Sequence, residues 1–333
     1  MKTCDMTTRQ IILAATGGTI ATPRHTHRPL NAGDLAHHLR QALPDPSLGI
    51  MPIDLDQVAS SNLTPNQVLA WIRQAHTWIQ EGYDGIVLTH GTDTLEETAF
   101  LFDLFWDQDA PIVITGAMRS AKSAGEDGPR NLIAAYQTAL DPRSRGKGPL
   151  VVMNEQIFAG CEVTKQHSWQ VSAFGSENGA LGAVGPFNPL TYDRPYFRSH
   201  PLPLPASLSG TIPILTPGLG DNGQWIRNWP SKDLQGLVVA AGGLAGIPPG
   251  FHLSIKEKAR NGIPVVICTR CPAGGTRSGV DGDGLLWAGH LNPVKARLAL
   301  LVGMQLFGPN SSKLLAVLRR NDERNQCGPS SRD

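Results

Sequence analysis

No apolar run in this sequence approaches the length of a membrane-spanning helix. Such a helix needs about 20 consecutive apolar residues, whereas apolar runs such as residues 11–15 and 265–268 are far shorter. The segment before residue 11 is mainly polar, and the apolar stretch and small-residue cleavage site of a secretory signal do not follow it. We therefore expect a cytoplasmic protein with no membrane partner.

Cysteine is scarce, and the few cysteines do not form the pattern of a disulfide framework. They number five, at Cys4, Cys161, Cys268, Cys271 and Cys327. An odd and scattered set of this kind is typical of a reducing compartment. Cys268 and Cys271 have the spacing of a zinc or redox pair, but no second pair or histidine cluster accompanies them. The sequence favours two small side chains where a strand turns into a loop, and no metal site.

The chain also has no excess of charge of either sign. Its 29 Lys and Arg residues face 28 Asp and Glu residues, for a net charge of +1. A balance of this kind creates no global field that would recruit nucleic acid. Neither a G-x-G-x-x-G fingerprint nor a Walker lysine is present, which disfavours a nucleotide cofactor.

Short apolar runs alternate with amphipathic stretches through the first half of the chain. The runs predict strands at residues 10–15, 54–59, 85–89, 112–115 and 150–153. Helices are expected after Thr64-Pro65, where Val68, Ile72, Ala75 and Ile79 share one face, and over residues 94–105 and 129–140. Alternation of this kind predicts an α/β fold with a parallel sheet covered by helices on both faces. A ligand site is expected beyond the carboxyl ends of the strands.

The composition changes between residues 189 and 217, where prolines 195, 201, 203 and 205 indicate a linker. Beyond it, strands are expected at 212–215, 237–241 and 265–269, and helices near 253–261 and 293–306. We therefore predict an N-terminal domain over residues 1–190, a proline-rich linker over 191–212 and a smaller C-terminal α/β domain over 213–333.

Two threonine-rich segments follow the first and third predicted strands. They are Thr16-Gly17-Gly18-Thr19-Ile20 and His90-Gly91-Thr92-Asp93-Thr94. Taken singly, the first suggests a tight glycine turn and the second a helix cap formed by Asp93-Thr94. Taken together at neighbouring strand ends, they predict a site. A threonine hydroxyl needs a base to act as a nucleophile, and Lys165 is a candidate to supply one beside Thr92 and Asp93, although an ordinary surface lysine is the alternative.

The same segments resemble the two signature motifs of bacterial-type L-asparaginases, of the asparaginase/glutaminase family. The second signature extends over residues 85–99, and the likeness continues through Gly116-Ala117-Met118-Arg119, residues 127–132, 151–154 and 163–165, and 289–297. The matched blocks are collinear over residues 10–305. The family's fold has two α/β domains, usually assembled as a tetramer of intimate dimers, so the resemblance implies a homotetramer.

The resemblance also implies roles for individual residues. Thr19 corresponds to the nucleophilic threonine, and Thr92, Asp93 and Lys165 correspond to the second threonine and the groups that move protons. Asp93 would also bind the α-ammonium group of L-asparagine, Ser60 its α-carboxylate, and the Ala117 carbonyl its side-chain amide. Gly18, Gly91 and Ser61 complete the implied substrate-binding set. The reaction implied is acyl transfer from the amide, with release of ammonia and then aspartate, and it requires no cofactor.

This sequence departs from the family pattern at the lid that follows the first signature. The lid tyrosine is missing, Arg28 falls near its position, and His25 and His27 lie close by. Arginine stays protonated and cannot serve as a base, so either histidine is an alternative proton-handling group.

Further departures lie in the substrate-binding positions. Ala245 stands where a polar residue is common, and Asp281 is the nearest acidic candidate for contact with the neighbouring subunit's substrate. Ser61 stands where glutaminase-active relatives often have glutamine, which predicts preference for asparagine with weaker glutaminase activity. The alternatives are a glutaminase or atypical amidase of the same superfamily, and a catalytically weak sensor of asparagine or aspartate.

Overall fold

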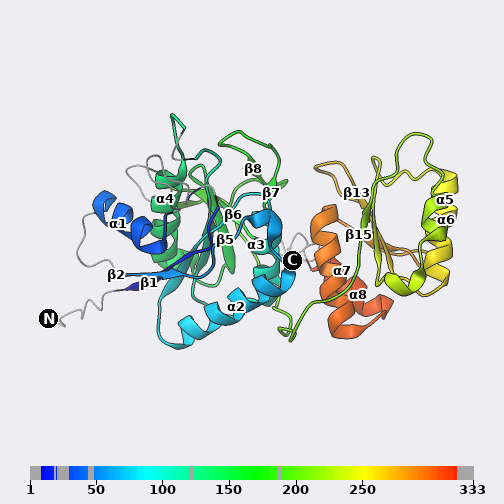
Figure 1. The fold of residues 1–333 in the computed structure, drawn as a ribbon, viewed down its shortest axis with the longest axis horizontal. Coiled ribbons are helices and arrows are strands. Elements are labelled where there is room, and N and C mark those ends of the chain that lie inside the picture. The colour runs from blue at the N-terminus through cyan, green and yellow to red at the C-terminus, as the bar shows by residue number, and fades with distance from the viewer. Residues whose placement is uncertain are drawn as a thin grey trace, which may run out of the picture. The chain divides into compact units, whose positions relative to one another are not determined.

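The computed structural model describes residues 9–18, 20, 30–43, 49–120, 123–185 and 190–320. The chain divides into two compact units, Met1–Leu202 and Pro203–Asp333, and each unit has a sheet of its own (Figure 1). The predicted linker, residues 191–212, spans this division, and its boundaries stay a prediction.

The first unit is built on an eight-stranded sheet in the order β10-β9-β6-β5-β4-β3-β1-β2. Its strands are β1 (Gln10–Ala15), β2 (Gly49–Asp54), β3 (Gly85–Thr89), β4 (Ile112–Thr115), β5 (Pro149–Met153), β6 (Gln156–Ala159), β9 (Gly182–Ala183) and β10 (Thr191–Tyr192). Strands β2, β1, β3, β4 and β5 are parallel, and β6, β9 and β10 are antiparallel. The predicted α/β fold with a parallel sheet is confirmed, with an antiparallel extension at one edge.

The strand predicted at residues 54–59 is wrong. The strand at this place is β2, Gly49–Asp54, which pairs with β1 alone and forms the edge of the sheet. Pro52 interrupts the short apolar run of β2, and Met51 within that run is exposed, whereas the central strands are buried throughout. Proline is tolerated there because an edge strand needs ladder hydrogen bonds on one side only.

Helices cover both faces of this sheet (Figure 1). They are α1 (Ala32–Ala42), α2 (Pro65–Gln80), α3 (Leu95–Phe105) and α4 (Gly128–Leu140). Helices α1 and α4 contact each other and the sheet, and α2 contacts α3, which packs on β5. Helix α2 begins as predicted, because the Thr64 side chain accepts a hydrogen bond from the Gln67 N–H and Pro65 lies in the first turn.

The second unit has a five-stranded sheet in the order β11-β12-β13-β15-β14. Its elements are β11 (Ile214–Leu215), α5 (Gln224–Asn228), β12 (Leu237–Ala241), α6 (Pro249–Arg260), β13 (Val265–Thr269), β14 (Ser278–Val280), β15 (Leu286–Ala288), α7 (Pro293–Phe307) and α8 (Ser311–Arg319). Helix α6 begins before the predicted residue 253, because its first turn accepts Pro249.

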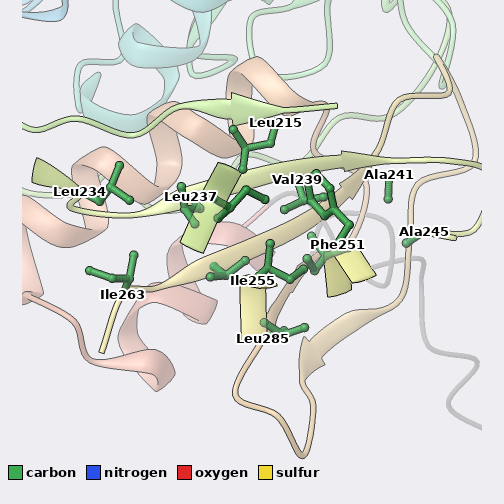
Figure 2. Close-up of a cluster of buried hydrophobic side chains, with 13 residues drawn as sticks. Leu215, Leu234, Leu237, Val239, Ala241, Ala245, Phe251, Ile255, Ile263 and Leu285 are labelled. Carbon is green, nitrogen blue, oxygen red and sulfur yellow. The ribbon is translucent and has the colours of Figure 1, made fainter. Parts of the chain in front are cut away.

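A buried apolar cluster holds the second unit together (Figure 2). Side chains of β12, such as Leu237 and Val239, pack with Phe251 and Ile255 of α6. Lys258 is a buried residue of α6, and its ammonium group donates to the carbonyls of Arg227 at 3.2 Å and Trp229 at 2.6 Å. These carbonyls at the end of α5 are the acceptors that a helix leaves unpaired, so the lysine closes that helix.

A separate two-stranded sheet in the first unit carries one of the candidate site residues. It pairs β7 (Thr164–Lys165) with β8 (Phe174–Gly175), and Lys165 lies opposite Phe174.

No helix in the described part of the chain is both long enough and apolar enough to cross a membrane.

Candidate active site

The two threonine-rich segments lie side by side at the carboxyl edge of the large sheet. Strands β1 and β3 are parallel neighbours in which Ala15 pairs with Thr89, so the loops after them start at the same level. The Thr16 hydroxyl donates to the Thr89 carbonyl at 2.7 Å. A Cβ atom at Gly18 would come within 2.7 Å of the Gly91 backbone. The glycines therefore let the two loops approach to a distance that any side chain would prevent.

A lysine, a threonine and a carboxylate meet beside these loops. The Lys165 ammonium donates to the Thr92 hydroxyl at 3.0 Å and to the Asp93 carboxylate at 3.1 Å. The side chain of Lys165 is 16% exposed and that of Asp93 is 65% exposed, whereas Thr92 is buried. The grouping predicted across 73 residues of sequence is thus present in the structure. One side of Asp93 is left open to solvent, where a ligand cation can reach it.

Glu96 fixes the backbone of Lys165, a role that no pattern in the sequence predicts. The Lys165 N–H donates to the Glu96 carboxylate at 3.1 Å. Glu96 lies in the first turn of α3, two residues beyond the end of the His90–Thr94 loop. Helix α3 therefore holds both the Thr92-Asp93 turn and the short β7 strand.

Ser60 joins the same group, and it also explains why the expected helix cap is not formed. The Ser60 hydroxyl accepts from the Asp93 N–H at 3.3 Å, and its carbonyl accepts from the Thr94 hydroxyl at 2.8 Å. Thr94 occupies the N-cap position of α3, but its side chain makes no capping hydrogen bond. Ser61 is the next residue of the same short helix, Ser60–Asn62, and is exposed.

Ala117 lies in the loop after β4, the strand next to β3. A Cβ atom on the preceding residue, Gly116, would come within 2.6 Å of the His90 carbonyl and 3.2 Å of the Thr92 methyl group. The Ala117 loop therefore packs directly on the loop that carries Thr92 and Asp93. Of the predicted residues, Gly18, Ser60, Gly91, Thr92, Asp93, Ala117 and Lys165 belong to this one region, and Ser61 lies at its margin.

Other predicted residues lie outside the described part of the chain. These are the candidate nucleophile Thr19 and the lid residues His25, His27 and Arg28. Ile20, which follows Thr19, is buried and lies close to Gly128, where an added Cβ atom would come within 3.1 Å of its side chain. The first signature loop therefore ends against the start of α4.

His90 is completely buried behind the loop and is uncharged at neutral pH. Its Nδ1 lies 2.6 Å from the Gly91 carbonyl and its Nε2 lies 2.9 Å from the Thr98 hydroxyl. Burial lowers its pKa from the ordinary value of 6.5 to about 4. The ring braces the Gly91-Thr92 backbone as a neutral hydrogen-bonding group.

Acidification from pH 7 to pH 5 should lower the free energy of unfolding through His90 by about 2 kcal/mol. The unfolded histidine takes up a proton as the pH falls through 6.5, whereas the buried ring, with its pKa of about 4, does not. Protons therefore favour the unfolded state over this interval. Urea denaturation at both pH values, on wild type and His90→Asn, measures the effect. The variant should lose about 2 kcal/mol less on acidification, and an equal loss in both proteins would contradict the assignment. The other histidines are present in both proteins and contribute equally to the change in unfolding free energy of each.

The candidate residues of the second unit have structural contacts of their own. The Asp281 carboxylate accepts from the backbone N–H groups of Asp283 and Leu285 at 3.0 Å each, and from the Trp287 indole at 3.0 Å. Asp281 and Ala245 line the same cavity of about 370 Å³. Contact of Asp281 with a neighbouring subunit's substrate stays a prediction.

Cys268 and Cys271 lie where a strand turns into a loop, as the sequence predicts. Cys268 is a buried residue of β13, and its thiol, whose pKa burial raises to about 12, lies 3.4 Å from the Val239 carbonyl. Cys271 is exposed in the loop that follows. Within the described ranges no group of three or more His, Cys, Asp or Glu side chains has the arrangement of a metal site.

Comparison with known proteins identifies both units. Residues 10–195 match the family model "Asparaginase, N-terminal", and residues 212–311 match the "Glutaminase/Asparaginase C-terminal domain". A probable L-asparaginase of Deinococcus radiodurans is 36% identical over 319 residues, covering 89% of this chain and 93% of its relative. A glutaminase-asparaginase of Acinetobacter glutaminasificans is 37% identical over 203 residues, covering 57% of this chain and 58% of that protein.

A solved structure agrees with these sequence matches. The crystal structure of a probable cytoplasmic L-asparaginase from Campylobacter jejuni has a TM-score of 0.83 and 29% identity, and the match covers 93% of this chain and 99% of that one. The two large sheets, the strand-end loops and the lysine–threonine–aspartate group therefore lie in a chain that belongs to the asparaginase/glutaminase family.

Proposed function

We propose that this protein is an L-asparagine amidohydrolase that releases aspartate and ammonia through a threonine nucleophile, with weaker activity on glutamine. The observation that carries the proposal is the contact of Lys165 with both Thr92 and Asp93, at the edge where two glycine-rich loops meet. Family membership gives independent support.

The proposed binding mode uses the charges and hydrogen-bonding groups of this edge. The exposed Asp93 carboxylate binds the α-ammonium group of asparagine, and the Ser60 hydroxyl binds its α-carboxylate, with Ser61 beside it. The Ala117 carbonyl accepts a hydrogen bond from the side-chain carboxamide. Backbone N–H groups of the loops around Gly18 and Gly91 face the carbonyl oxygen of that amide. In this binding mode the carboxamide carbon is the atom that Thr19, the nucleophile implied by the resemblance, attacks.

Two acyl-transfer steps follow from this placement. The Thr19 hydroxyl oxygen attacks the carboxamide carbon, its proton passes through the Thr92–Lys165–Asp93 group to the carboxamide nitrogen, and the carbonyl oxygen becomes an oxyanion stabilised by the loop N–H groups. Collapse of this intermediate breaks the C–N bond, and the protonated nitrogen leaves as ammonia. Water then attacks the aspartyl ester by the same route, which releases aspartate and restores Thr19. One oxyanion donor contributes about 3–4 kcal/mol and proton transfer about 10²–10⁴-fold in rate.

A catalytically weak sensor of asparagine is the alternative from another class. A binding protein needs the groups that hold the two ends of the amino acid, but it has no need for a lysine held against a buried threonine hydroxyl at 3.0 Å. This contact favours catalysis over simple binding. A glutaminase or an atypical amidase has the same chemistry and differs in the room that it leaves around the substrate.

Measured ammonia release from L-asparagine, L-glutamine, D-asparagine and small amides tests the proposal on wild type and Thr19→Ala. We expect L-asparagine to be the fastest substrate, and Thr19→Ala to lower its turnover by at least about a thousandfold. Thr16→Ala is the matched control, because the Thr16 hydroxyl is committed to the Thr89 carbonyl. It should retain most of its activity in the folded protein. Equal or faster turnover of glutamine would contradict the substrate preference, and turnover unchanged in Thr19→Ala would contradict the nucleophile.

We also propose that the enzyme is a cytoplasmic homotetramer, a dimer of intimate dimers. The support is family membership and the likeness to the probable cytoplasmic enzyme. Light scattering of the purified protein measures the mass of the assembly, and fractionation of the source cells tests the location.

A further inference from the structure

Asp127 stands at the N-terminus of α4 but does not cap it. An aspartate at an N-cap normally accepts a hydrogen bond from the N–H of one of the next residues, and Asn31, Thr64 and Asn292 cap their own helices in this way. The side chain of Asp127 makes no such bond. Its carboxylate is directed elsewhere, at the expense of a stabilising contact worth about 1 kcal/mol in helices.

The carboxylate of Asp127 instead holds the loop that contains Ala117. One oxygen accepts from the Met118 N–H at 3.0 Å, and the other accepts from the Arg119 N–H at 2.8 Å. Buried Asn131, one turn further along α4, donates to Asp127 at 3.0 Å and to the Gly116 carbonyl at 3.0 Å. The peptide groups on both sides of Ala117 are therefore fixed.

The contact with Met118 determines where the Ala117 carbonyl points. The Ala117 C=O and the Met118 N–H belong to one planar trans peptide group and point in opposite directions. Because Asp127 holds the N–H end, the carbonyl oxygen is directed away from Asp127. Ala117 is only 1% exposed, yet no donor among the described residues bonds to its carbonyl. A buried carbonyl is normally paired, so this one offers an acceptor to a donor that the described residues do not supply, such as the N–H of a bound amide.

We propose that Asp127 is a positioning residue that aims and strengthens the Ala117 carbonyl as the acceptor for the N–H of the substrate's carboxamide. The inference rests on the proposed function, because it assumes an amide substrate at this edge. A carboxylate that accepts from one end of a peptide group polarises the group and makes its carbonyl a better acceptor. The hydrogen bond from the carboxamide nitrogen to the Ala117 carbonyl strengthens as this nitrogen gains a proton and leaves as ammonia.

The test compares an amide with an ester in the full-length enzyme. L-Aspartic acid β-methyl ester presents the same amino-acid end and the same carbonyl as asparagine, but its leaving group is methanol and has no N–H to donate. In Asp127→Ser the shorter hydroxyl can cap α4 but loses the reach to Met118. We expect kcat/KM to fall about tenfold for L-asparagine and less than about twofold for the ester.

Two further variants make the comparison specific. Asp127→Asn should recover asparagine hydrolysis to within about threefold of wild type, because its amide oxygen can still accept from the Met118 N–H. Asp141→Ser is the matched control, since Asp141 caps its own short helix by accepting from the Arg143 N–H at 2.8 Å. It should leave the ratio of amide to ester hydrolysis unchanged. Thermal unfolding of each variant separates loss of fold from loss of rate.

The outcomes separate this inference from the proposed function. An amide-to-ester ratio that falls in Asp127→Ser and recovers in Asp127→Asn would support the role of Asp127. Equal loss on both substrates, or an unchanged ratio, would overturn that role while leaving an active asparaginase. A wild type that is folded yet hydrolyses neither substrate would overturn the proposed function and this inference with it.

Discussion

Replacing Lys165 by methionine is expected to lower kcat for L-asparagine by about a thousandfold while KM changes by less than about threefold. Methionine keeps most of the volume of the side chain but removes the ammonium that contacts Thr92 and Asp93. Proton transfer that involves Thr19 and Thr92 then lacks the lysine side chain that takes part in it. Asp93 keeps its negative charge for the α-ammonium group, so substrate binding should persist.

The loss should be chemical rather than structural. The Asp93 partner of Lys165 is 65% exposed, and ion pairs in contact with solvent add little to stability. Thermal unfolding of Lys165→Met should therefore stay close to that of wild type. Lys147→Met is the matched control in the same unit, because Lys147 packs over the Tyr192 ring at 4.7 Å, and its kinetics should be unchanged.

Lys165→Arg should not rescue the activity. Guanidinium keeps the positive charge, but it stays protonated and its planar fork cannot reproduce the geometry of an ammonium group. If Lys165→Met or Lys165→Arg retained more than a tenth of the wild-type kcat, the proposed role of Lys165 would be wrong.

The arrangement of the first unit was predictable wherever the strands are buried on both faces. Residues 85–89 form a continuous apolar run bounded by turn residues, and the structure places β3 over those residues. The edge strand β2 was misplaced because Pro52 interrupts its short apolar run, and proline disfavours the assignment of a strand. Sequence periodicity reports burial, and an edge strand is buried too little to give a clear signal.

The candidate site was predictable in part for a related reason. Thr92 and Asp93 follow a strong strand, so their position at the sheet edge could be expected. Lys165 lies on a two-residue strand in a separate small sheet, and no periodicity fixes its place; the resemblance to a family supplied it. Asp127 was missed because an aspartate before Gly-Pro is the usual sequence of a helix cap, and only the hydrogen bonds reveal its different role.

A methyl group added at Gly18 should both destabilise the first unit and disable the site. Gly18 has a φ of +86°, and a Cβ atom there would come within 2.7 Å of the Gly91 Cα and N atoms. These are backbone atoms, which cannot rotate away as the end of a side chain can. For Gly18→Ala we expect a loss of about 3–5 kcal/mol in the free energy of unfolding, the sum of left-handed strain and overpacking.

The variant Gly82→Ala separates the two causes of this loss, which are backbone strain and overpacking. Gly82 has a φ of +99°, but nothing lies within 4 Å of an added Cβ atom, so alanine there should cost about 1–2 kcal/mol from strain alone. The remaining loss in Gly18→Ala measures the clash with Gly91.

The clash must push apart the loop before Thr19 and the loop that carries Thr92, and a displacement of about 1 Å costs about a hundredfold in rate. Urea denaturation and asparagine turnover of the folded variants measure both effects. Equal stability of the two variants, or full activity in Gly18→Ala, would mean that the loops can separate without cost, and that their close approach does not set the geometry of the site.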